Sequence, residues 1–327
     1  MKNIRRSALI GALILQAPAS FGAVNFIFNY TDVGVGFNDP TEGAARRAGL
    51  EEAASRVAAI FSAYNADVHI DVDGSQTNDT TLASAGSNFN FTPSGPGFDG
   101  RGDVGIKILG GVDPSPGTAD GKVDWNFEDF MWEAGDDFQP GEMDLISTAM
   151  HELLHAVGVS SDITQSGING YGTSPGNPAI WAPFDQFVGD GTGALIDGSF
   201  ALDGSRWNTA SVGGTGTSPA GAGLYFYGAN AMALNGGNPV PLYSPTAWVD
   251  GSSGSHLDTD FFTGANAKMM NHEATVAEGL DLRDIDALTV AMLQDMGFTE
   301  ASLVPEPAST ALLGLGGIAL LIRRRRA

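Results

Sequence analysis

The run HELLH holds the residues of this chain that are best suited to chemistry. His151 and His155 are four positions apart, so on a helix their side chains lie on one face and can offer two imidazole nitrogens to one metal ion. Glu152 projects beside them and is free to accept a proton. Two imidazoles at this spacing with an adjacent carboxylate are typical of a zinc centre that activates water for hydrolysis.

The residues around HELLH predict the helix that this spacing requires. Asp144 is a helix-start residue, and Gly158 is a typical helix stop in the left-handed conformation. Between them, apolar residues recur at spacings of three and four and predict a buried stripe of Ile146, Ala149, Leu153 and Val157. We therefore expect one helix between Asp144 and Gly158 that carries both histidines.

A catalytic zinc ion needs a third protein ligand, because three such ligands leave one position open for water. The chain has no cysteine, so this ligand must be a histidine or a carboxylate. Three candidates stay open from the residues alone: Asp162, His256 and His272.

The run HELLHAVG resembles the extended HExxHxxGxxH pattern of the metzincin metalloproteases, with Ser161 at the last position. Serine is a poor zinc ligand. Farther along, SGSHLD contains His256 and is followed by Met269 and Met270. This order is similar to that of the leishmanolysin-type metzincins, in which the third histidine follows a long insert. The runs FYGANAMA, VPLYSP and DMGF also resemble bacterial PEP-CTERM metalloproteases of the HExxH type.

The resemblance covers most of residues 24–298 and is strongest at HELLH and from SGSHLD to DMGF. It implies that His256 is the third zinc ligand and that Glu152 is the general base. It also implies that Met270 is the Met-turn residue beneath the zinc ion, with Met269 as the alternative. The function implied is a secreted zinc-dependent endopeptidase acting on protein or peptide substrates.

Two other functions stay open. The first is a non-catalytic, zincin-like protein displayed in the cell envelope or matrix, which the serine at position 161 favours. The second is a zinc hydrolase that acts on a bond other than a peptide bond.

Both ends of the chain carry export features. Residues 1–23 combine basic residues, an apolar run and small residues, the layout of a signal peptide that signal peptidase removes. Residues 304–327 hold VPEP, an apolar run and four arginines, and resemble the PEP-CTERM sorting signal of Gram-negative bacteria, which an exosortase processes. Because this apolar run is short for a membrane span, we expect transient membrane association and a final location in the envelope or outside the cell.

The formal net charge of −22 excludes nucleic acid as a partner, because such a body repels phosphates. The surplus carboxylates are suited to collecting calcium. Asp113, Asp120 and Asp124 share one loop, but an EF-hand register would begin on Pro116. The pattern therefore favours a tight polar turn there.

The order of elements predicts an α+β fold of the zincin (metzincin-like) class in one domain, residues 24–303, with two lobes. In the upper lobe, residues 24–158, we expect a mixed sheet, a backing helix and the zinc-binding helix. Its predicted elements are strands at 24–30, 67–72, 104–109 and 122–127, a helix at 44–64 and a loop at 78–102. In the Gly-rich, irregular lower lobe, residues 159–303, they are short strands at 184–188, 223–227 and 240–243 and a helix at 284–294.

Overall fold

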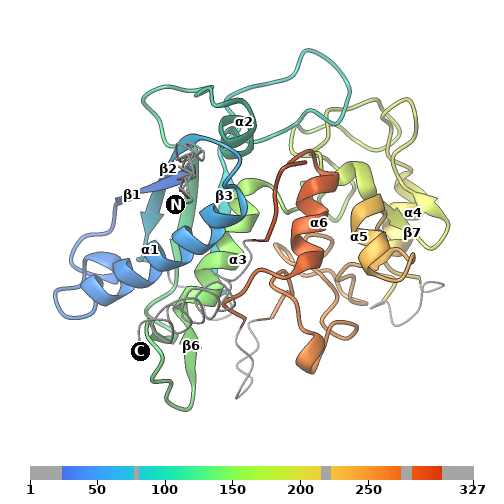
Figure 1. The fold of residues 1–327 in the computed structure, drawn as a ribbon. Helices are drawn as coiled ribbons and strands as arrows, with labels where there is room; N and C mark the ends of the chain where they lie inside the picture. The colour runs from blue at the N-terminus through green and yellow to red at the C-terminus, as the bar shows by residue number, and fades with distance from the viewer. Residues whose placement is uncertain (1–23, 77–80, 215–221, 274–281, 304–327) are drawn as a thin grey trace, which may run out of the picture.

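The computed structural model describes residues 24–76, 81–214, 222–273 and 282–303 (Figure 1). The predicted signal peptide and sorting tail lie outside these residues. The described chain has a mixed α+β fold with a four-stranded main sheet, a second, smaller sheet and six α-helices. The predicted α+β class is therefore confirmed.

The main sheet has the strand order β1-β2-β4-β3. Strands β1 (Val24–Tyr30), β2 (Ala66–Asp73) and β4 (Gly121–Trp125) are parallel, and β3 (Ala83–Ser87) runs antiparallel to β4 at the edge. Residues alternate along β2: Val68 and Ile70 are fully buried, whereas His69 between them is exposed. This period of two shows that one face of the sheet packs on the core and the other faces solvent.

Helices cover the buried face. Helix α1 (Gly43–Ile60) joins β1 to β2, and α3 (Leu145–Val157) packs against both α1 and β3. The predicted stripe of α3 is buried, namely Ile146, Ala149, Leu153 and Val157, and so are the apolar residues Leu50, Ala54, Val57 and Phe61 of α1 and its end. Helix α1 ends four residues before the predicted Tyr64, but Phe61 and Tyr64 still pack together, against Phe298. Helix α3 is thus fixed by contacts with a second helix and with the edge of the sheet.

Two predictions for this part of the chain are wrong. Residues 104–109 lie in a helix, α2 (Asp103–Gly110), and not in a strand. Their β-branched residues mimic a strand, but Val104 and Ile108 are buried four positions apart, and Gly111 ends the helix at a φ of 62°. Within the predicted loop, residues 83–87 form β3, because main-chain pairing with β4 compensates for the weak strand preference of ASAGS.

The side chain of Lys107 holds the acidic loop after α2 in place. The Lys107 ammonium lies 2.8 Å from a carboxylate oxygen of Asp113 and 2.9 Å from one of Asp120, and Lys122 pairs with Asp124 at 2.6 Å. Asp113 and Asp120 therefore serve the loop itself, which agrees with the predicted polar turn, whereas Asp124 lies in β4.

The remaining elements are short. Strands β5 (Met131–Glu133) and β6 (Glu142–Asp144) pair just before α3, and the second sheet has the order β10-β9-β7-β8. Its members are β7 (Val188–Asp190), β8 (Gly193–Ala194), β9 (Tyr225–Phe226) and β10 (Val240–Pro241), accompanied by helices α4 (Gly204–Ala210) and α5 (Ala229–Leu234). The predicted strand at 184–188 is wrong, because Asp185–Phe187 forms a 3₁₀ turn (η2) and β7 begins only at Val188. The predicted strands at 223–227 and 240–243 are present but shorter.

Helix α6 (Ala287–Asp295) lies between α3 and α5 (Figure 1) and corresponds to the predicted helix at 284–294. Asp286 caps its start by accepting a hydrogen bond from the Thr289 amide at 3.0 Å. The apolar residues Ile285, Leu288, Met292 and Met296 in and beside this helix are buried. After α6 the chain returns to α1, where the Ser302 amide donates to the Ile60 carbonyl at 3.0 Å.

Asp144 ties the start of α3 to the segment before α6. Its carboxylate accepts a hydrogen bond from the Ile146 amide at 2.9 Å and binds two nitrogens of Arg283 at 2.8 and 3.0 Å. Arg283 is only 8% exposed, so its guanidinium depends on protein partners. One carboxylate thus serves as helix cap and as counter-charge.

We expect Asp144→Ala to lower the free energy of unfolding by about 2–4 kcal/mol, because it removes the helix cap and one of the two described carboxylates that pair with Arg283, the other being Asp136. Asp144→Asn should cost less, since asparagine can still cap the helix. Urea denaturation of the exported chain measures both, with Asp137→Asn at an exposed position as the control. An alanine variant as stable as the control would contradict the double role of Asp144.

Candidate metal centre

Helix α3 brings the first two imidazoles together. Asp144 caps its start, and Gly158 ends it at a φ of 119°, a left-handed conformation that favours glycine. His151 and His155 therefore lie one turn apart on the same face, and their Nε2 atoms are 2.9 Å apart. The predicted helix and its two boundaries are confirmed.

His256 approaches the helix from a loop that is held by main-chain pairing on both sides. The Tyr243 amide donates to the His256 carbonyl at 2.8 Å, and the Leu257 amide donates to the Met270 carbonyl at 2.8 Å. Leu257 also forms isolated bridges with Leu242 and Asn271. The loop position of His256 is thus fixed by two adjacent segments of backbone, at residues 242–243 and 270–271.

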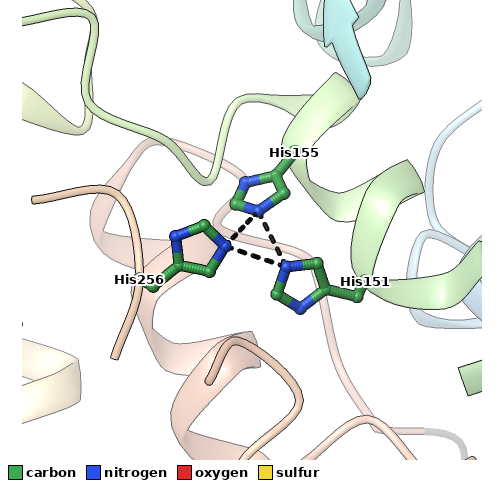
Figure 2. Close-up of side chains that lie close together, drawn as sticks. All are labelled: His151, His155 and His256. Carbon is green, nitrogen blue, oxygen red and sulfur yellow. Dashed lines mark hydrogen bonds between the residues drawn. The ribbon is translucent and has the colours of Figure 1, made fainter. Parts of the chain in front are cut away.

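The three imidazoles form a nearly equilateral triangle (Figure 2). The Nε2 atom of His256 is 3.0 Å from that of His151 and 3.0 Å from that of His155. A tetrahedral zinc ion with Zn–N bonds of about 2.0–2.1 Å would hold its ligand nitrogens about 3.3 Å apart. The triangle is therefore only slightly tighter than a zinc centre, and these three residues form a group that can hold a metal ion.

The opposite ring nitrogen of each histidine determines which tautomer faces the centre. The Nδ1–H groups donate to carbonyl oxygens: His151 to Met269 at 2.7 Å, His155 to Val159 at 2.8 Å and His256 to Ser252 at 3.0 Å. A carbonyl can only accept, so each Nδ1 carries the proton and each neutral ring turns a bare Nε2 lone pair inward. Three lone pairs that face one another repel unless a cation lies among them, so the donor set fits a metal ion.

Burial keeps these rings neutral. Desolvation lowers the pKa of His151 to about 4 and that of His155 to about 3. It also lowers the pKa of His256 well below the ordinary value, and the two other histidines lower it further. Neutral imidazole is the form that binds a metal, so protons compete weakly for this site near neutral pH.

Glu152 is buried beside the triangle, with 6% of its surface exposed. Burial raises the pKa of its carboxyl to about 8, and a hydrogen bond from the backbone of Ala85 on β3 opposes this effect. A carboxyl with such a pKa changes its protonation state near neutral pH. It can therefore take up and release a proton under ordinary conditions.

Met269 and Met270, which follow His256 in the sequence, make different contacts. Met269 contributes its carbonyl oxygen to His151, and its amide donates at 3.0 Å to Asp286, the cap of α6. Met270 is fully buried, and its carbonyl is paired with Leu257. The chain at these two methionines thus lies directly behind the imidazole of His151, and the contact runs through Met269.

The other two candidate ligands lie elsewhere. The Nδ1 atom of His272 is 2.7 Å from the Thr259 hydroxyl, and its ring stacks on Tyr243 with the ring centroids 3.5 Å apart. Asp162 is not part of the group formed by the three imidazoles. The structure brings His256, and neither His272 nor Asp162, into the triangle.

A cavity of about 120 Å³ opens beside His155. Its walls include the edge strand β3, through Ala85, the chain before α2, through Arg101, and the chain after α3, through Asp162. The sequence pattern missed this wall, because the predicted loop at 78–102 hides β3. It also missed the carbonyls of Val159, Ser252 and Met269, since any residue can supply a carbonyl.

One segment of the chain matches a known protein family model. Residues 303–326 match the PEP-CTERM protein-sorting motif, which confirms the predicted sorting tail, export to the cell envelope of a Gram-negative bacterium and processing by an exosortase. A search of curated proteins finds no match. None of the helices in the described part of the chain combines the length and apolar character needed to cross a bilayer.

We expect His256→Ala to lose tightly bound zinc, because it removes one of three converging nitrogens. Asp162→Ala should keep one zinc ion per chain, because Asp162 lies outside the triangle. Elemental analysis of the purified, dialysed variants measures the stoichiometry. The assignment of the third ligand is wrong if the alanine at position 256 retains zinc and the alanine at position 162 does not.

The metal-free chain should become less stable below about pH 6.5, because the unfolded histidines take up protons there while the buried ones do not. The stability supplied by the low folded pKa values is complete above pH 6.5 and decreases toward pH 4. The raised pKa of Glu152 has the opposite effect: its contribution to the stability of the folded chain increases as the pH falls from about 8 to 4.5. Metal-free Glu152→Gln should therefore lose more stability than the wild type between pH 7 and pH 5. Urea midpoints at the two pH values measure this, and equal losses would contradict the raised pKa of Glu152.

Proposed function

We propose that this chain is an exported zinc-dependent endopeptidase with a zincin fold of the metzincin type. The observation that carries the proposal is the convergence of three unprotonated Nε2 atoms next to a buried glutamate that follows the first histidine on the same helix. His151, His155 and His256 would hold the zinc ion. A zinc ion bound there supplies a Lewis acid that polarises a carbonyl group and acidifies water.

Glu152 has the surroundings expected of the proton carrier. Its carboxylate is outside the triangle of nitrogens, and burial raises its pKa to about 8. The carboxylate form accepts a proton from the attacking water, and the protonated form returns it to the amine that leaves when the peptide bond breaks. The Ala85 amide holds the carboxyl in place and links it to β3.

The edge strand β3 supplies a docking site for an extended peptide. The Asn126 amide donates to the Leu82 carbonyl, and the Asn88 amide donates to the Asp120 carbonyl, so even-numbered residues of this segment pair with β4. The main-chain groups of Ala83 and Ala85 therefore point toward the free edge, where Ala85 reaches Glu152. A peptide that pairs with this edge would pass beside the three imidazoles.

Conversion of Glu152 to glutamine tests the proposal. Glu152→Gln should retain zinc and lose about 10²–10⁴-fold of peptidase activity, because the amide cannot accept the proton. Turnover of casein or gelatin measures activity, and His69→Ala, on the exposed face of β2, is the matched control. A chelator should abolish turnover by the wild type, and added zinc should restore it.

Unchanged proteolysis by Glu152→Gln would remove this residue from the mechanism. Zinc binding without turnover of either protein substrate would favour the display protein or a hydrolase of another bond.

A further inference from the structure

A second group of buried oxygen atoms lies in the chain that follows α3. Asp185 begins the turn η2 and is fully buried, and both of its carboxylate oxygens lack a hydrogen bond. The Ser161 hydroxyl and the amides of Asp162 and Ala182 lie near enough to favour its ionised form, but they fall short of hydrogen-bond geometry. A buried carboxylate in this condition needs another partner.

The charged group that acts on Asp185 has the same sign. Asp162 acts on Asp185 electrostatically and, together with burial, raises its pKa well above the ordinary value, while burial raises the pKa of Asp162 to about 6. The Tyr171 hydroxyl is also buried without a partner and is influenced by Asp162. Among the described residues, no lysine, arginine or histidine acts on either carboxyl.

Two buried carboxylates without a counter-charge are costly, so the pair must either share a proton or bind a cation. The donors around Asp185 offset the effect of burial only in part, so its carboxyl is ionised only where a cation lies beside it. All the available ligand atoms are oxygens, and hard oxygen donors select calcium rather than a transition metal. Asp162 also lines the cavity beside His155, so water can complete the six to eight ligands of calcium.

We propose that Asp162 and Asp185 form a calcium site, with the Tyr171 hydroxyl and solvent as further oxygen ligands. The site is distinct from the three imidazoles and does not depend on whether the chain hydrolyses peptides. Calcium there would join the chain just after α3 to the turn η2. It would thereby steady Val159, whose carbonyl holds the ring of His155.

Hydrogen exchange of the zinc-loaded, exported chain with and without calcium tests the site. At calcium ten times above its dissociation constant, amides in residues 160–171 and 182–187 should exchange about tenfold more slowly, because the ion stabilises the closed form. Asp185→Asn should abolish this protection, and Asp137→Asn, at an exposed position, should preserve it. Magnesium at the same concentration should protect less, since it demands a tighter octahedral site.

The absence of calcium-dependent protection in these segments of the wild type would overturn the proposal and indicate a shared proton. Equal protection in Asp185→Asn would overturn it as well. If Asp185→Asn does not fold, Asp162→Asn replaces it, and the wild-type measurement still decides. Peptidase activity is not used as a readout, so failure of the calcium site and failure of the proposed function remain distinguishable.

Discussion

The mutual approach of three unprotonated imidazole nitrogens is the constraint on which the rest of the structure depends. With Nε2 atoms 2.9–3.0 Å apart, the three lone pairs converge on one point, where they favour a cation. Each ring is oriented by a carbonyl on a different segment, namely the exit of α3 and two loops. A change in any of these segments therefore alters the geometry of the centre.

The framework is continuous from helix to helix. Asp286 caps α6 and also receives the Met269 amide, and the Met269 carbonyl receives the proton of His151. At the other end of α3, Asp144 is joined to Arg283, three residues before the same cap. Helices α3 and α6 are thus linked at two points.

The sequence predicts correctly those elements in which apolar residues recur at a regular spacing. The buried stripe and the boundaries of α3 follow from the spacing of apolar residues and from Asp144 and Gly158. The same reasoning failed at β3, whose residues ASAGS have little preference of their own and become a strand by pairing with β4. It failed at α2, where the β-branched residues Val104, Ile106 and Ile108 mimic a strand.

At the candidate site the two helical histidines follow from spacing alone, whereas His256 is indicated only by the resemblance, because 100 residues of chain separate it from His155. Asp185 gave no signal, since one aspartate in FDQFV reveals neither its burial nor its neighbour.

After α6 the chain returns to α1, and this contact determines which residues would bear a mechanical force applied to the C-terminal tail. The sorting motif starts at residue 303, and the residue before it is fastened to the last carbonyl of α1. Glu300 is fastened to the Tyr64 hydroxyl, and Ala301 accepts a hydrogen bond from Gln294. Tension on the tail during processing is therefore borne by these contacts at the end of α1 and on α6. From there it reaches the imidazoles through α1 and α3 or through α6, Asp286 and Met269.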